Sequence, residues 1–188
     1  MKETKNILLV GVGGQGTILV SRLLTQGLIK AGYDVKMSEI HGMAQRGGSV
    51  STQVRYGSKV HAPIIGRGQA DIMVAFEKME AVRYVEFLKP GALAVINDYE
   101  IVPMSVASGF ADYPQGTIEA MEANFEVIRV DAAETAARLG NSKVMNVVLL
   151  GAMVRAVGLD DIDWEQVLRE QLSPKILDLN LKAFNAYK

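Results

Sequence analysis

Short apolar segments alternate along the chain with longer stretches in which apolar residues recur every three or four positions. The short segments predict strands, which we place at residues 7–10, 33–40, 71–76, 92–96 and 125–130. The longer stretches predict helices, which we place at residues 14–31, 78–88, 131–140, 144–156 and 164–170, with a last helix beginning near Pro174. The apolar face of the first helix comprises Ile18, Leu19, Leu23, Leu24 and Leu28. Because strands and helices alternate, we predict a three-layer α/β/α domain.

Two segments depart from this alternation. Residues Ser49–Tyr56 alternate between polar and apolar, which predicts a half-exposed strand, so the mainly parallel sheet is expected to be mixed. The C-terminal block is helical only, and we expect it to cover one face or edge of the sheet or to meet a partner. Residues 97–115 contain Pro103 and Pro114 and predict a loop. No linker or repeat divides the chain, so residues 1–188 are expected to form a single domain.

The first strand and the first helix are joined by the sequence Gly11-Val12-Gly13-Gly14-Gln15-Gly16. Glycine allows a turn with positive φ and lets another group approach the backbone closely. The free N–H groups at the start of the following helix favour an anion, typically a phosphate. The turn therefore predicts a phosphate or ligand site formed by Gly11, Gly13, Gly14, Gln15, Gly16 and Thr17. A turn of this kind can also serve only to pack a helix against a strand.

The second predicted strand ends near an acid, Glu39, which follows the glycine motif by roughly 20 residues. In dinucleotide-binding domains a carboxylate at this place binds a ribose hydroxyl. The arrangement predicts a Rossmann-like domain and leaves open a free-standing NAD(P)-binding oxidoreductase or a nucleotide-sensing module. Glu39 can equally form a local ion pair with Arg46.

Composition narrows the possible functions. Hydrophobic residues make up 49% of the chain and the net charge is −1, so no nucleic-acid partner is expected. There is no cysteine, which removes thiolate metal sites, cysteine nucleophiles and any iron–sulfur cluster held by this chain. The two histidines, His41 and His61, lack the spacing of metal ligands, and no metal site is expected. The N-terminal apolar run is too short for a signal peptide or a membrane span, so we expect a cytoplasmic protein without membrane contact.

A second glycine-rich loop follows the second predicted strand, in the sequence Ser38-Glu39-Ile40-His41-Gly42-Met43-Ala44-Gln45-Arg46-Gly47-Gly48-Ser49-Val50. It leaves the strand at the carboxyl end, on the same edge of the sheet as the first turn. Gln45 and Arg46 supply amide and guanidinium donors, and the two adjacent glycines expose backbone N–H groups. We predict ligand or partner contacts from Glu39, His41, Gln45, Arg46, Gly47, Gly48 and Ser49. A surface turn capped by an arginine is the alternative, and no residue is predicted to be catalytic.

Taken together, the two loops resemble the gamma-type subunit or domain of 2-oxoacid:ferredoxin oxidoreductases. The likeness extends to Asp71, Asn97, the segments 146–152 and 179–184, and the pair Pro174-Lys175. It covers essentially the whole chain, and within the family it favours the enzymes that act on indolepyruvate and other arylpyruvates.

The resemblance implies oxidative decarboxylation of a 2-oxo acid to an acyl-CoA, with electrons passed to ferredoxin. It implies an accessory subunit, because the chain has no cysteine and no Gly-Asp-Gly…Asn segment to hold the magnesium of thiamine diphosphate. Thiamine diphosphate, magnesium and the iron–sulfur clusters are then expected in a catalytic partner subunit. Ferredoxin is expected to interact with the assembled complex. The glycine-rich face would serve coenzyme A, another phosphate-bearing ligand or the docking of that partner. A homodimer of the isolated chain stays open.

Overall fold

A six-stranded mixed sheet forms the centre of the computed structural model, which describes residues 3–42 and 46–187. Its strands, in the spatial order β2-β3-β1-β4-β5-β6, are β2 (Asp34–His41), β3 (Ser49–Gly57), β1 (Lys5–Val12), β4 (Ala70–Ala75), β5 (Leu88–Asn97) and β6 (Glu126–Val130). β1, β4, β5 and β6 are parallel, whereas β3 runs antiparallel to both β1 and β2. The expected mixed sheet is therefore confirmed, with the alternating segment as its antiparallel strand. The prediction that this strand is half-exposed is wrong, because the first helix packs against β3 and the chain beyond β3 returns to donate the Ile65 N–H to the buried Gln53 side chain.

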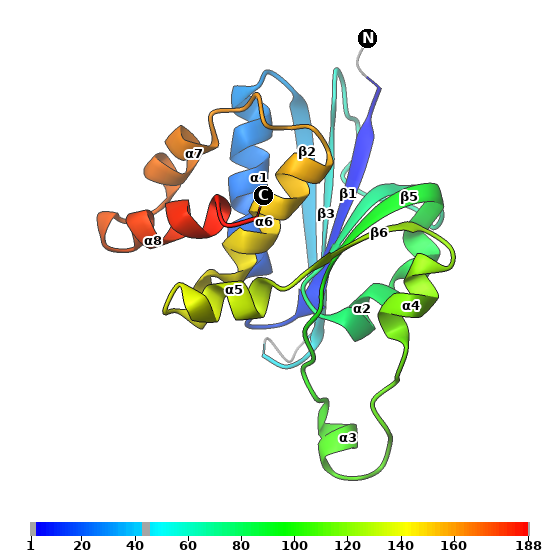
Figure 1. The fold of residues 1–188 in the computed structure, drawn as a ribbon. Helices are drawn as coiled ribbons and strands as arrows, with labels where there is room; N and C mark the ends of the chain where they lie inside the picture. Colours follow the sequence, from blue (N-terminus) through cyan, green and yellow to red (C-terminus); the bar gives the residue numbers. More distant parts are fainter. Residues whose placement is uncertain (1–2, 43–45, 188) are drawn as a thin grey trace.

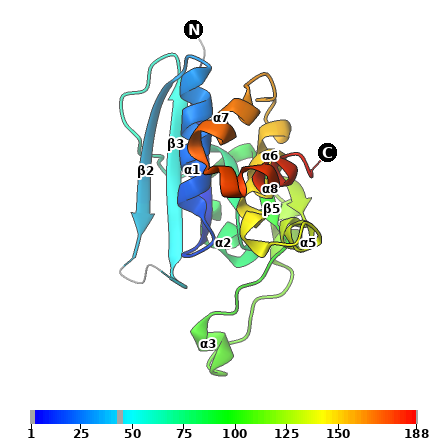
Figure 2. The ribbon, with the colours of Figure 1, turned by 90° about the vertical axis from the view of Figure 1, so that its left-hand side faces the viewer.

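Helices cover both faces of the sheet, as Figures 1 and 2 show. One face carries α1 (Thr17–Lys30), α5 (Ala132–Arg138) and α6 (Met145–Ala156), and the other carries α2 (Lys78–Arg83) and α4 (Thr117–Glu122). The C-terminal helices α7 (Trp164–Gln171) and α8 (Pro174–Phe184) pack on α1 and α6. The C-terminal block thus thickens one helical layer, and the three-layer α/β/α prediction holds.

Two hydrophobic cores lie on opposite faces of the sheet. Ile7 and Leu9 of β1 face the layer of α1 and α6, whereas Leu8 and Val10 face α2 and α4. Successive side chains of a strand point to opposite faces, so a strand covered on both sides must be apolar throughout. This requirement explains the uninterrupted apolar run at residues 7–10.

The segment between β4 and β5 differs from the prediction of one helix over residues 78–88. α2 ends at Arg83, a 3₁₀ helix follows at Val85–Phe87, and β5 begins at Leu88. The helix cannot extend farther because Leu88 already pairs with Ala70 of β4.

The segment after β5 also differs from the predicted loop. It contains a short helix, α3 (Met104–Ala107), and projects from the carboxyl edge of the sheet (Figure 1). The chain then returns to the sheet in α4, a helix that was not predicted from the sequence. We call residues 98–116 the arm.

A further difference concerns Ile18, which was predicted on the apolar face of the first helix but is 51% exposed.

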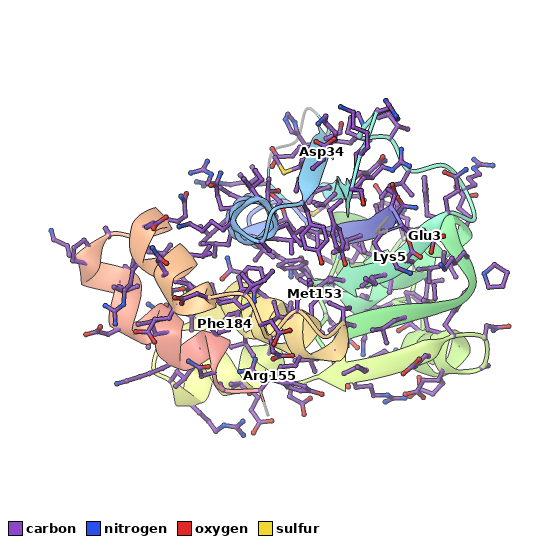
Figure 3. All side chains as sticks on the ribbon, turned by 90° about the horizontal axis from the view of Figure 1, so that it is seen from above. Glu3, Lys5, Asp34, Met153, Arg155 and Phe184 are labelled. Carbon is purple, nitrogen blue, oxygen red and sulfur yellow. The ribbon has the colours of Figure 1, made fainter. Side chains whose placement is uncertain are left out.

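The helices α6 and α8 approach each other closely at Gly151. The Arg155 guanidinium donates hydrogen bonds to the carbonyl oxygens of Gly151 (2.8 Å) and Phe184 (3.0 Å), and it lies 5.4 Å from the Phe184 ring centroid. Figure 3 shows Arg155 and Phe184 in this helical layer. A Cβ at position 151 would lie only 2.1 Å from the Phe184 carbonyl oxygen, so only glycine fits without a shift of α8.

We expect Gly151→Ala to lower the free energy of unfolding by about 1–3 kcal/mol, because the added methyl group overpacks a backbone contact. Urea denaturation of the purified chain measures the change. Gly42→Ala is the matched control, since a Cβ at Gly42 would meet no atom within 4 Å and its φ is not positive. Equal stability of the two variants would contradict the tight α6–α8 contact.

Candidate functional site

The two glycine-rich loops are joined directly to each other. The Gly13 N–H donates to the Gly48 carbonyl (2.8 Å), and the Gly47 N–H donates to the Gly13 carbonyl (3.0 Å). The join continues into the sheet, where Ser49 at the start of β3 pairs with Val12 at the end of β1. The predicted nearness of the loops at the carboxyl edge is therefore a consequence of the β1–β3 register.

The Gln15 side chain forms hydrogen bonds within the protein. Its side-chain oxygen accepts the Val12 N–H (2.7 Å), and its amide nitrogen donates to the Phe76 carbonyl (2.8 Å) at the end of β4. A Cβ on Gly11 would lie 2.9 Å from both the Gln15 side-chain oxygen and Phe76 Cβ. Gly11 and Gln15, both placed in the phosphate site by sequence, therefore hold the turn against β4.

The remaining residues of the turn keep free donors. The backbone N–H groups of Gly13 and Gln15 are used by the Gly48 and Val12 carbonyls. Among the described residues, no acceptor is found for the N–H groups of Gly14, Gly16, Thr17 and Ile18. Four unpaired donors at the start of a 14-residue helix form an arrangement that attracts an anion.

Gly14 and Gly16 both have positive φ, but they differ in the space that a side chain would find. Gly14 has φ +105° and a Cβ there would meet nothing within 4 Å, so its open side is available for another molecule. Gly16 has φ +81° and a Cβ there would lie 2.3 Å from the Asn146 side-chain nitrogen. Asn146 donates to the Gly16 carbonyl (3.2 Å), so helix α6 also holds the turn.

A cleft of about 360 Å³ lies between the turn and the end of β2. Its lining includes Gly14, Thr17, Glu39, His41 and Thr52. Glu39 is exposed, and one of its carboxylate oxygens accepts the hydroxyl of the buried Ser21 on α1 (3.1 Å). Glu39 therefore has a local partner other than Arg46, and it lines the same cleft as the exposed His41.

A larger cleft of about 720 Å³ lies on the other side of the turn. It is lined by Gly13–Gly16 together with residues from the arm, α5 and the start of α6, namely Tyr99, Ile101, Ala133, Ser142, Lys143, Met145 and Asn146. Lys143 is exposed and forms no ion pair with any described residue, which leaves its ammonium available to an anion. Lys143 was not predicted from the sequence, because no local motif connects it with a turn about 130 residues earlier.

The second loop contains both exposed and structural residues. Arg46 is exposed and forms no ion pair within residues 3–42 and 46–187, whereas Gln45 lies outside the described residues. Gly47 has φ +77°, so its conformation favours glycine. The Ser49 hydroxyl donates to the buried Glu80 carboxylate (2.5 Å), which makes Ser49 an anchor of the loop.

Two buried carboxylates on α2 were not singled out from the sequence. Glu80 ties the second loop to α2 and also accepts from Arg83 (3.0 Å). Glu77 caps α2 by accepting the Glu80 N–H (3.0 Å), and it also accepts the Tyr113 hydroxyl of the arm. Burial and the Glu77 carboxylate raise the pKa of the Tyr113 phenol, so Tyr113 remains a donor at neutral pH. Their roles could not be predicted from the sequence, because Ser49 and Tyr113, the residues that they bind, are 31 and 36 positions away along the chain.

No group of three or more histidine, aspartate or glutamate side chains among the described residues is placed to hold a metal ion. None of the helices described has both the length and the apolar character needed to cross a membrane.

We expect Gln15→Leu to lower the free energy of unfolding by about 1–3 kcal/mol, because it removes the side-chain acceptor of the Val12 N–H and leaves the Phe76 carbonyl with Asn97 as its side-chain donor. Chemical denaturation measures the loss. Gln26→Leu on α1 is the control, since Gln26 is partly buried and its side chain forms no hydrogen bond with the residues that the structure describes. A stable Gln15→Leu variant that has lost only ligand binding would contradict this supporting role and identify Gln15 as a ligand contact.

Comparisons with known proteins agree with this architecture. A family model described as pyruvate ferredoxin/flavodoxin oxidoreductase matches residues 6–187. Indolepyruvate oxidoreductase subunit IorB of Pyrococcus horikoshii is 40% identical over 191 residues, covering 98% of this chain and 94% of that protein. Pyruvate oxidoreductase subunit PORC of Thermotoga maritima has a similar fold, with a TM-score of 0.74, 21% identity and coverage of 98% and 95% of the two chains. The 2-oxoglutarate:ferredoxin oxidoreductase of Magnetococcus marinus matches with a TM-score of 0.73 and 21% identity, covering 99% of this chain but 30% of that one. The chain belongs to the pyruvate ferredoxin/flavodoxin oxidoreductase family.

Proposed function

We propose that the chain is the accessory subunit of a complex that oxidatively decarboxylates indolepyruvate or another arylpyruvate to an acyl-CoA, with ferredoxin as electron acceptor. The relative from Pyrococcus horikoshii, named as an indolepyruvate oxidoreductase subunit, supports this substrate class. The proposal assigns thiamine diphosphate, magnesium and the iron–sulfur clusters to a catalytic partner subunit and places the complex in the cytoplasm. This chain does not fit the clusters, since it has no cysteine to ligate iron.

This chain is proposed to contribute its glycine-rich edge, by which we mean the first turn (Gly11–Gly16) and the joined end of the second loop (Gly47-Gly48). This edge binds coenzyme A or another phosphate-bearing ligand, or helps to seat the catalytic subunit. The observation that carries this proposal is the set of unpaired N–H groups at Gly14, Gly16, Thr17 and Ile18, beside two clefts. A phosphate at the start of α1 would accept from these donors and be favoured by the helix dipole. Lys143, which lines the larger cleft, and the exposed Arg46 of the second loop would add charged contacts.

An independent NAD(P)-dependent oxidoreductase is the less favoured alternative. In an ordinary dinucleotide-binding domain the second strand lies next to the first. Here β3 is inserted between them, so β2 and its Glu39 lie about 10 Å from β1 instead of about 5 Å. Glu39 also shares its carboxylate with Ser21. Glu39 therefore does not lie where a dinucleotide-binding domain places the carboxylate that binds the ribose hydroxyl.

The isolated chain is expected to show no oxidation of arylpyruvates with coenzyme A and a viologen acceptor, and activity should appear on addition of the catalytic subunit. The reason is that the proposed redox cofactors reside in the partner. Turnover by the two preparations, alone and mixed, is measured under anaerobic conditions. Activity of the pure chain alone would contradict the accessory role.

Coenzyme A binding tests the proposed ligand site. We expect Arg46→Ala or Lys143→Ala to weaken coenzyme A affinity of the assembled complex at least tenfold, as expected for loss of one charge-assisted hydrogen bond of roughly 1.5–3 kcal/mol. The variant that responds identifies the side chain that contacts the phosphate, and a response of Lys143→Ala places the phosphate at the larger cleft. Isothermal titration with coenzyme A measures the affinity, and thermal unfolding should be nearly unchanged.

Arg67→Ala is the control for these variants. Arg67 is exposed, pairs with Glu86 at the surface, and lies in the connection between β3 and β4, away from the glycine-rich edge. If Arg46→Ala and Lys143→Ala both bind coenzyme A as the control does, the glycine-rich edge does not bind coenzyme A through these residues. A large loss of stability in Arg46→Ala would instead identify a structural cap.

A further inference from the structure

The arm exposes an unusual concentration of apolar side chains, and we call the part that carries Val102, Met104 and Phe110 its tip. Eleven large hydrophobic residues are exposed in the described part of the chain, and four of them, Tyr99, Val102, Met104 and Phe110, belong to the arm. Phe110 is 89% exposed and Met104 is 80% exposed, the two highest values in this set. Scattered apolar residues on a surface are ordinary, whereas a projecting cluster marks an interaction site.

The base of the arm is held firmly by polar contacts. The buried Glu77 accepts the Tyr113 hydroxyl at the returning end of the arm and the Ile101 N–H (3.4 Å) at its outgoing end. Lys78 forms ion pairs with Glu100 (2.5 Å) and Asp98 (3.6 Å). The contact with Glu100 raises the pKa of the Lys78 ammonium despite the opposing effect of burial. Both ends of the arm are thus fixed to the start of α2, so binding would order only the segment between them, which reduces the conformational freedom lost.

The arm adjoins the larger cleft. It leaves the carboxyl edge of the sheet, where the glycine-rich turn also lies (Figure 1). Tyr99 and Ile101, at the arm's outgoing end, line the 720 Å³ cleft together with Gly13–Gly16. A protein that packs along the arm from its tip to its base would therefore cover the open side of this cleft.

The size of the tip argues against a second copy of this chain as the partner. Complete burial of Val102, Met104 and Phe110 would cover only a few hundred Å², on the order of 150–250 Å² for an aromatic side chain. A stable interface buries about 800 Å² on each partner. Residues 101–111 carry no charge, so the tip offers apolar contact and little electrostatic attraction. The tip therefore fits an apolar pocket in a protein that also contacts neighbouring surfaces of this chain.

We propose that the arm is a docking element whose apolar tip, centred on Met104 and Phe110, inserts into an apolar pocket of the catalytic subunit and seats that subunit over the larger cleft. The proposal rests on the accessory role proposed above. It identifies the surface that the partner uses and places the partner beside the ligand site. In the Magnetococcus marinus enzyme the matching region is 30% of one longer chain, so a domain of this fold can be built into a larger subunit.

Binding of the catalytic subunit to the double variant Met104→Ser/Phe110→Ser tests the proposal. We expect the affinity, measured by biolayer interferometry with immobilised catalytic subunit, to fall at least tenfold. Both side chains are largely exposed, so the melting temperature should remain that of the natural chain. Ile64→Ser/Ile176→Ser is the matched control, since these exposed isoleucines lie outside the arm, and its affinity should stay within about twofold of the natural chain.

Three results would overturn the proposal. If the natural chain binds and activates the catalytic subunit and the arm variant binds equally well, only the docking role of the arm is wrong. If light scattering shows a dimer of the natural chain that the arm variant dissociates, the occupant is a second copy. If the natural chain does not bind the catalytic subunit at all, the docking role and the accessory role both fail.

Discussion

The two hydrogen bonds of the Gln15 side chain are the constraint on which the candidate site depends. They join the end of β1 to the end of β4 at Val12 and Phe76. At this point the connections separate, because α1 lies on one face of the sheet and α2 on the other, and such a separation leaves a crevice at the carboxyl edge. With Gln15 occupied in the structure, the neighbouring Gly14, Gly16 and Thr17 keep their N–H groups available.

The start of α2 links the parts of the molecule that are expected to meet other molecules. Glu80 holds Ser49 at the end of the second loop, and Glu77 holds the arm through Tyr113 and Ile101. A buried carboxylate is unfavourable unless hydrogen bonds replace its water, and both acids receive such bonds. A disturbance of this helical turn would thus reach the loop and the arm together.

The sequence predicts the layers and the carboxyl-edge location of the site, because strand periodicity, the glycine turn and the second loop are local signals. It does not separate ligand contacts from supports: Gln15 and Ser49 are polar residues in glycine-rich loops, and only their inward contacts identify them as anchors. It also misses Lys143 and the two α2 acids, because their positions depend on contacts between distant segments. The arm contains Pro103 and Gly109 and therefore predicts a loop, whereas the exposure of Phe110 is a property of the folded chain.

The antiparallel strand β3 has a consequence for how the chemistry of the site can change. Eight residue pairs join β3 to β1, from Lys5 with Tyr56 to Val12 with Ser49. A shift by one residue would turn the buried side chains of β3 to the wrong face, so selection for a stable core keeps this alignment. The pairing ends at Ser49, so the alignment of the core does not depend on the side chains of the loop that precedes it. Substitutions in that loop would therefore change the chemistry beside Gly13 without altering the register on which the core of this domain depends.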